Sequence, residues 1–75
     1  MGKPNTHKQI LEKFGERMQK VRQSKDITQE ELADILSMHR TYIGLIERGE
    51  RNPTIRTLYK IAKALKVPAS DLLPF

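Results

Sequence analysis

The stretch that decides the fold runs from Thr28 to Gly49 and reads TQEELADILSMHRTYIGLIERG. It opens with a capping box, in which the Thr28 hydroxyl accepts from the Glu31 amide and the Glu31 carboxylate accepts from the Thr28 amide. The helical pattern breaks at Ser37-Met38-His39, which suits a tight turn, and Gly49 provides a stop for the helix that follows. The sequence therefore predicts two short helices joined by a tight turn.

Apolar residues give each of these two helices one face for a core. Leu32, Ile35 and Leu36 follow the i, i+3, i+4 spacing in the first helix. Ile43 and Ile46 are three residues apart in the second. We expect these side chains to hold the pair of helices against the rest of the chain.

The second helix opens with polar residues, Arg40 and Thr41, and Gly44 and Leu45 share their face opposite the apolar stripe. Arg40 can donate two hydrogen bonds to O6 and N7 of guanine, and Thr41 can bond a base or a phosphate. A recognition helix presents its N-terminal end to base edges in the major groove. We interpret residues 28–49 as a helix-turn-helix that binds DNA; the alternative is that these are ordinary surface residues.

Other polar residues near these helices are candidate contacts with the DNA backbone. Gln29 lies at the start of the first helix, where the positive end of the helix dipole suits a phosphate oxygen. Tyr42 suits either a phosphate or the edge of the core, and Arg51 and Asn52 suit either DNA or a solvated loop. His39 suits either a phosphate or a capping role.

The remaining segments predict further helices. A first helix follows Thr6, with an apolar stripe along one face and Gly15 as either a close packing point or a tolerated glycine. A fourth helix begins after Thr54 and has Ile55 on its apolar face. Residues 69–73 suit one or two more turns. Residues 1–5 have no periodicity, and we expect them to be disordered.

Length and composition limit the class of protein. A chain of 75 residues is expected to form one domain, residues 1–75, and its helix-forming composition predicts an all-α fold. No cysteine is present, which excludes disulfides and thiolate metal sites, and a net charge of +5 favours a polyanionic partner. No apolar run approaches the ~20 residues that span a bilayer, so we expect a cytoplasmic protein without a membrane partner.

Several segments resemble the phage repressor and Cro family of helix-turn-helix proteins, also called XRE-type. The segments are TQEELA, Met38, RTYIGLIERGERNPT and the helix from Leu58 to Leu65, and the resemblance extends from about Phe14 to Leu73. HRTYIGLIERGERN is most similar to the small controller proteins of restriction-modification systems. The resemblance implies a compact five-helix bundle, the lambda repressor-like DNA-binding domain, which binds palindromic operators as a dimer.

The resemblance also implies roles for individual residues. Gln29 and Arg48 would contact phosphates, Tyr42 would lie beside the backbone, and bases would face Arg40, Thr41, Gly44 and Leu45. Arg22 would pair with Glu47 across the first and third helices in a structural, partly buried ion pair. Ser37 departs from the family pattern, which usually has a glycine at this position to allow a left-handed turn; a serine there would be strained or change the turn.

A dimer is also expected on physical grounds, because one module of this size makes few base contacts, whereas two copies read half-sites about 34 to 36 Å apart. The best candidate interface is the apolar C-terminal segment, residues 67–75. Its apolar members are Val67, Leu72, Leu73 and Phe75. Packing of the segment onto its own core is the alternative.

The sequence therefore predicts a sequence-specific transcriptional regulator that binds a palindromic operator as a homodimer, with RNA polymerase as a further candidate partner. The alternative is an antitoxin or co-activator-type module that binds a partner protein with the same fold. We expect no enzyme and no cofactor, since the sequence has no glycine-rich phosphate loop and no cluster of metal ligands.

Overall fold

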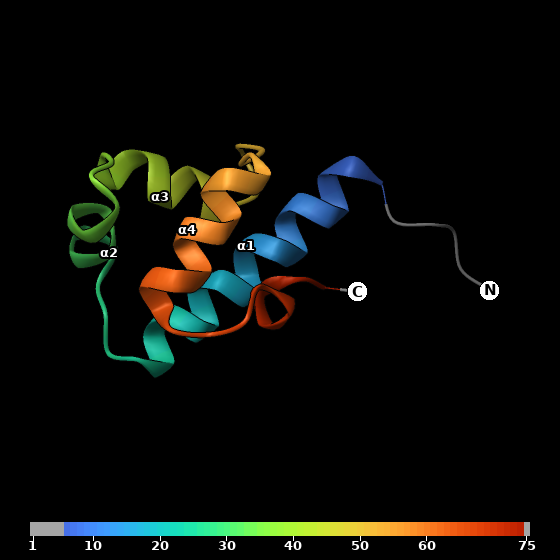
Figure 1. Ribbon diagram of the computed structural model, residues 1–75. Helices are drawn as coiled ribbons and strands as arrows, with labels where there is room; N and C mark the ends of the chain where they lie inside the picture. The colour runs from blue at the N-terminus through green and yellow to red at the C-terminus, as the bar shows by residue number, and fades with distance from the viewer. Residues whose placement is uncertain (1–5, 75) are drawn as a thin grey trace.

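The computed structural model describes residues 6–74, and within them the fold is all-α. The predictions for residues 1–5 and for Phe75 lie outside the described residues. The elements in chain order are α1 (His7–Ser24), α2 (Gln29–Leu36), α3 (Arg40–Glu47), α4 (Ile55–Leu65) and the 3-10 helix η1 (Ala69–Leu72). In Figure 1, α2 and α3 lie next to each other on the left of the molecule, and α4 crosses in front of α1.

The fifth predicted helix is a short 3-10 helix and not an α-helix. It has four residues, with Pro68 before it and Pro74 shortly after it. Proline supplies no backbone donor, and four residues are too few for a regular α-helix with its i to i−4 hydrogen bonds. The described chain therefore has four α-helices and one 3-10 helix.

The predicted helix starts at threonines are confirmed. Thr6 and Thr28 each form a complete capping box, with Gln9 and Glu31 respectively, and the Thr54 hydroxyl accepts from the Thr57 amide at 3.1 Å. A cap of this kind satisfies an otherwise unpaired amide and stabilises the helix by about 1 kcal/mol. These local bonds fix where α1, α2 and α4 begin.

The four α-helices end in the same way. A residue with positive φ follows each helix, at Asp26, Ser37, Gly49 and Lys66. The amide of the next residue then bonds back to the helix, from Ile27 to Arg22 (3.2 Å), Met38 to Ala33 (2.8 Å), Glu50 to Leu45 (2.8 Å) and Val67 to Ala62 (3.0 Å). This is the Schellman arrangement, which pairs carbonyls that the helix end leaves free.

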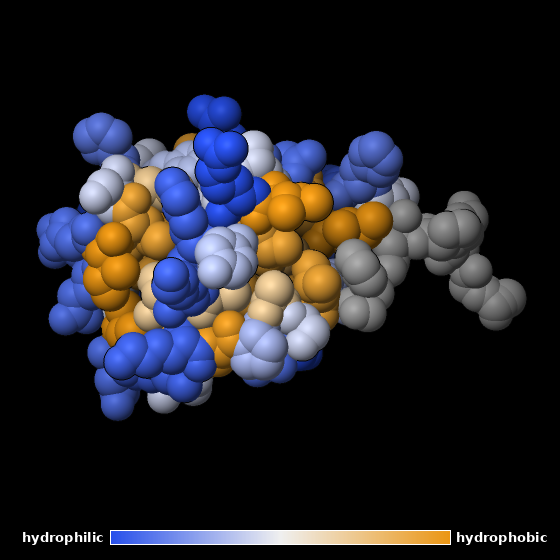
Figure 2. All heavy atoms as spheres, viewed as in Figure 1, coloured by the Kyte–Doolittle hydropathy of each residue, from blue (hydrophilic) through white to orange (hydrophobic). Residues whose placement is uncertain are grey.

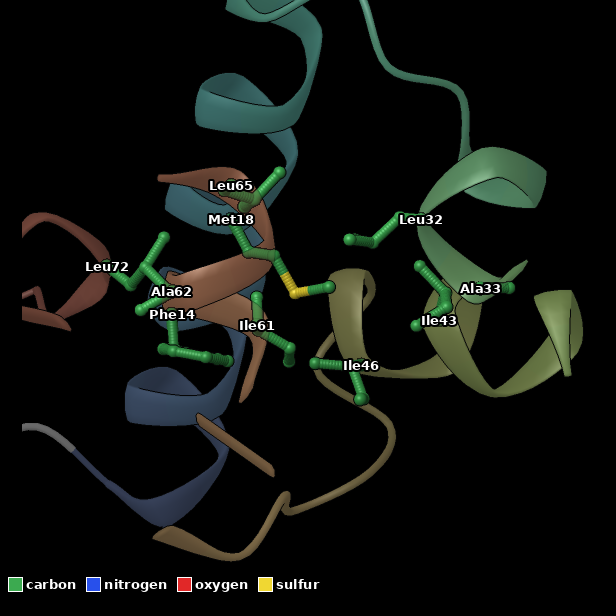
Figure 3. Close-up of a cluster of buried hydrophobic side chains, with 10 residues drawn as sticks. All are labelled: Phe14, Met18, Leu32, Ala33, Ile43, Ile46, Ile61, Ala62, Leu65 and Leu72. Atoms are coloured by element: carbon green, nitrogen blue, oxygen red, sulfur yellow. The ribbon is translucent and has the colours of Figure 1, made fainter. Parts of the chain in front are cut away.

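The core lies between α1 and the other elements, and each element contributes to it (Figure 3). Its buried apolar side chains are Phe14, Met18, Leu32, Ala33, Ile43, Ile46, Ile61, Ala62, Leu65 and Leu72. Met18 is fully buried and extends from α1 toward α2 and α3, so it joins the helix-turn-helix to the rest of the fold. Gly15 is a close packing point, because an added Cβ would overlap the carbonyl oxygens of Ile46 and Glu47.

Two predicted core positions are wrong. Ile35 is 58% exposed and Ile55 is 83% exposed. Ile35 lies at the outer edge of the α2 stripe, where Leu32 and Ala33 already fill the space against the core. Ile55 is the first residue of α4, so it lies at the end of the helix and not over the core. None of the described helices is long and apolar enough to cross a membrane.

Candidate nucleic-acid interface

The structure brings five of the predicted DNA-contacting residues together at one place on the surface. A shallow depression between the start of α2 and the outer face of α3 is lined by Gln29, Arg40, Thr41, Gly44 and Arg48. We call it the α2–α3 depression. It combines two arginines, an amide and a hydroxyl, which is a donor-rich surface suited to phosphate oxygens and base edges.

The N-terminal end of α3 is open. His39 is its N-cap residue but makes no side-chain capping bond. Its backbone carbonyl accepts from the amides of Tyr42 and Ile43 at 3.0 and 3.3 Å. The positive end of the α3 dipole therefore faces outward beside Arg40 without a side-chain cap, which favours an anionic partner.

A buried ion pair fixes α3 relative to α1. The Arg22 Nε donates to Glu47 Oε2 at 2.6 Å, and Arg22 Nη2 donates to Glu47 Oε1 at 3.1 Å. Both residues are buried, and Arg22 Nη1 also donates to the Ile27 carbonyl at 2.7 Å. The ion pair implied by the resemblance is present, in the bidentate form that gives an arginine–carboxylate pair a defined orientation.

Gln29 belongs to the same hydrogen-bond cluster. Its Nε2 donates to Glu47 Oε1 at 3.0 Å, so the carboxylate receives both Arg22 and Gln29. An amide nitrogen has two N–H groups, and this contact leaves the second N–H and the carbonyl oxygen for another partner. This contact could not be predicted from the sequence, because nothing in the spacing of Gln29 and Glu47 indicates that their side chains meet.

Gly44 forms the floor of the α2–α3 depression. It is buried, and a Cβ added to it would lie 3.2 Å from Arg48 Nη1 and 3.7 Å from Gln29 Nε2. A glycine has no side chain with which to contact a base. Gly44 thus leaves room for the end of the Arg48 side chain. It remains a predicted base-facing position, and Arg40 and Thr41, both exposed, are the candidate base-contacting side chains.

Arg48 is exposed and is paired with a near neighbour. Its Nε donates to Glu50 Oε2 at 3.2 Å, and both side chains are more than half exposed. Exposed pairs of this kind contribute little to stability, about 0 to 1 kcal/mol. The guanidinium can therefore exchange the Glu50 carboxylate for a phosphate at small energetic cost.

Other predicted backbone contacts lie outside the α2–α3 depression. Tyr42 is half-buried and packs against the core, as in the core-edge alternative. The predicted backbone contacts His39 and Arg51 are exposed, whereas Leu45, which was predicted to face bases, is half-buried and also lies outside the depression. Asn52 is also exposed, but it lines a different hollow, between α1 and α4.

The predicted dimer residues separate in the structure. Leu72 is fully buried in the core of its own chain, so its assignment to the interface is wrong and the alternative of packing onto the chain's own core holds for it. Val67 and Leu73 are half-buried.

A mostly apolar hollow lies beside Leu73, and its apolar lining is Ile10, Leu11, Phe14, Pro53, Ile55, Leu58, Leu73 and Pro74. We call it the apolar hollow; Figure 2 shows an orange area over this part of α1 and α4.

Comparison with sequence families gives a match to the helix-turn-helix model over residues 18–72. Several curated relatives are control proteins, and two of them are described here. The chain is 45% identical to control protein C.SmaI of Serratia marcescens over 64 residues, which is 85% of this chain and 76% of the relative. It is 48% identical to control protein C.BamHI of Bacillus amyloliquefaciens over 63 residues, or 83% of this chain and 78% of the relative.

Controller proteins are also among the solved structures that this chain resembles. The restriction-modification controller protein C.AhdI of Aeromonas hydrophila superimposes with a TM-score of 0.81 and 38% identity, covering 84% of this chain and 96% of that one. The controller protein C.Esp1396I, solved as a tetramer in complex with its natural 35 base-pair operator, gives a TM-score of 0.76 and 41% identity. That match covers 84% of this chain and 83% of the other.

Proposed function

The chain belongs to the helix-turn-helix family, and we propose that it is a sequence-specific DNA-binding transcriptional regulator of the restriction-modification controller type. The observation that carries this proposal is the α2–α3 depression, which gathers Gln29, Arg40, Thr41 and Arg48 on one surface. The similarity to control proteins supports the same function. The protein acts by occupying an operator in the cytoplasm, without a chemical step or a cofactor.

Each side chain of the depression has a distinct role in this proposal. Arg40 contacts guanine and Thr41 a neighbouring base or phosphate, since both project from the first turn of α3. Gln29 and Arg48 bind phosphates on either side and set the position of α3 in the major groove. Glu47 holds the Gln29 amide at 3.0 Å, so it contributes to DNA binding through Gln29 while remaining a structural residue.

The functional unit in this proposal is a homodimer on a palindromic operator. The apolar hollow, with the highly exposed Ile55 at its edge, is the surface best suited to a second copy, and Leu73 remains part of it. Burial of apolar area provides the association energy. A two-fold dimer places two α3 helices on half-sites about one helical turn apart. RNA polymerase bound next to the operator is the further partner by which such a regulator acts on transcription.

Binding to selected and unrelated duplexes tests the DNA-binding proposal. The operator is first obtained by selection of bound duplexes from a random pool. Arg40→Ala should then lower affinity for the selected duplex by roughly 5- to 150-fold, as expected for loss of a bidentate base contact of about 1–3 kcal/mol, and leave unrelated duplexes nearly unaffected. Gln29→Ala should weaken both alike, because phosphate contacts carry no sequence information.

Arg56→Ala is the matched control, because Arg56 is an exposed arginine on α4 outside the depression. Arg56→Ala should leave the affinity for the selected duplex and the affinity for unrelated duplexes nearly unchanged, because salt screens a charge that lies far from the DNA. Equal loss on every duplex after Arg40→Ala would contradict a base-reading role. If no duplex is bound specifically, the regulator proposal fails and the protein-interaction alternative takes its place.

A further inference from the structure

A third surface hollow lies between α2 and α4. It is lined by Ile35, Leu36, Ser37, Lys60, Lys63, Ala64 and Lys66. We call it the lysine-rimmed hollow. Figure 2 shows an apolar area at the α2 end of the molecule with strongly hydrophilic side chains beside it. It shares no lining residue with the α2–α3 depression or with the apolar hollow.

The chemistry of this hollow combines apolar and cationic groups. Ile35, Leu36 and Ala64 supply apolar surface, and Ile35 is 58% exposed. Lys60, Lys63 and Lys66 are all exposed, and no ion pair within the described residues joins them to a carboxylate. Lys63 lies 6.0 Å from the centroid of the Tyr59 ring, a weak cation–π contact that supplies no counter-ion. The hollow is therefore an apolar surface bordered by three lysines without a carboxylate partner.

Two helix ends border this hollow. Ser37 and Lys66, which line it, both have left-handed backbone, with φ of 56° and 60°. Asp26 has the same conformation at the end of α1, outside the hollow, so this conformation belongs to the helix ends. It places the Lys66 side chain at the rim of the hollow, and the case for a ligand rests on the apolar and cationic lining.

We propose that the lysine-rimmed hollow binds an acidic amphipathic helix of a partner protein. Apolar side chains along one face of such a helix would cover Ile35, Leu36 and Ala64, while its carboxylates would meet the three lysines. A groove between two helices is a common docking site for an amphipathic helix. Opposite charges along the rim would increase the rate of association and fix the orientation of the helix.

The observations disfavour two other occupants. In a symmetric contact with a second copy the same patch meets itself, so lysines would face lysines and repel each other. DNA would pair its phosphates with the lysines but leave Ile35 and Leu36 against a polar backbone. The hollow and the α2–α3 depression use different residues, so binding of an acidic partner requires none of the side chains that line the depression. The inference does not depend on the proposed DNA-binding function.

Titration of the isotope-labelled full chain followed by nuclear magnetic resonance tests the inference. The probe is a synthetic helical peptide with leucines on one face and glutamates on the other. Two matched peptides carry lysine in place of glutamate, or alanine in place of leucine. Binding of the first peptide should shift the backbone resonances of residues 35–37 and 60–66. Equal binding of the lysine peptide, or shifts confined to α3, would overturn the proposal.

Variants of exposed residues separate the hollow from general charge attraction. Lys60→Glu should weaken binding of the acidic peptide by roughly three- to tenfold, the range expected for one exposed ion pair that becomes repulsive. Lys8→Glu makes the same charge change at an exposed position of α1 outside the hollow and should have a much smaller effect. Equal loss in both variants would overturn the assignment. A random-sequence DNA duplex that shifts the same resonances more strongly than the peptide would assign the hollow to phosphate instead.

Discussion

Glu47 is the residue at which three helices are joined by hydrogen bonds. Its carboxylate, on α3, accepts from Arg22 of α1 and from Gln29 of α2. All buried side-chain donors and acceptors of the described residues have a partner. Loss of one member would therefore leave the others unpaired in a buried site. An unpaired buried charge destabilises a fold more than replacement of both partners by apolar residues does.

We predict that Glu47→Ala lowers the free energy of unfolding by about 3–5 kcal/mol, because it leaves the buried Arg22 guanidinium without its counter-charge. Replacing both residues by apolar ones, Arg22→Met with Glu47→Leu, should restore most of this loss. Urea denaturation measures both. Glu16→Ala is the control, since Glu16 pairs with Lys20 at 4.0 Å on the exposed face of α1 and its loss should be small.

A small effect of Glu47→Ala would contradict the view that the pair is desolvated. If the double variant is as unstable as the single one, the orientation of α3 and not the unpaired charge would be the cause of the loss. The double variant should also bind DNA less tightly than the native chain, because Gln29 loses the acceptor that now holds its amide.

At the scale of the elements, the turn between α2 and α3 contains Ser37, for which the sequence predicted either strain or a changed turn. Ser37 adopts left-handed backbone, with φ of 56° and ψ of 44°, a conformation that glycine adopts without strain. The amide bonds of the turn are nonetheless complete, from Ser37 to the Asp34 carbonyl and from Met38 to the Ala33 carbonyl. The turn geometry is thus retained, and the serine is strained within it.

We predict that Ser37→Gly raises the free energy of unfolding by about 0.5–1 kcal/mol, because relief of the left-handed strain exceeds the extra entropy of glycine in the unfolded chain. The urea midpoint should rise while the dependence on denaturant stays constant. Ser37→Ala should give no such gain, since alanine has the same Cβ. A less stable Ser37→Gly would show that the serine side chain makes a compensating interaction.

The helix boundaries were predictable from sequence because their causes are local. Thr28 and Glu31 are three residues apart, so the capping box that starts α2 can be seen in the sequence and is present in the structure. The exposure of Ile55 and the burial of Leu72 could not be predicted in this way. Both depend on where the end of α4 and η1 lie relative to α1, which the periodicity of one helix does not contain.

The candidate site was predictable to a similar degree. Arg40 and Thr41 were selected from the polar start of α3, and the structure places them beside Gln29 on one surface. Two other features could not be predicted from the sequence. They are the position of Gly44 at the floor of the depression and the hydrogen bond from Gln29 to Glu47. Contacts between side chains of different helices depend on the crossing geometry, which sequence spacing alone does not define.

At the scale of the whole molecule, the proposals assign three surfaces to different partners. The α2–α3 depression, the apolar hollow and the lysine-rimmed hollow have no lining residue in common. No lining residue would therefore have to serve two of the proposed partners, which are DNA, a second copy and an acidic helix. The two exposed isoleucines distinguish the last two surfaces, since Ile55 lines the apolar hollow and Ile35 the lysine-rimmed hollow.

We predict that Ile55→Glu converts the protein from dimer to monomer, because two copies would place carboxylates in an apolar contact and leave them without partners. Its fold should be retained, since Ile55 is 83% exposed. Sedimentation equilibrium measures the mass. Affinity for the selected palindrome should fall, because two linked half-sites bind far more tightly than one. Ile35→Glu is the control and should remain dimeric; if it dissociates instead, copies meet at the lysine-rimmed hollow, and the acidic-partner proposal is also wrong.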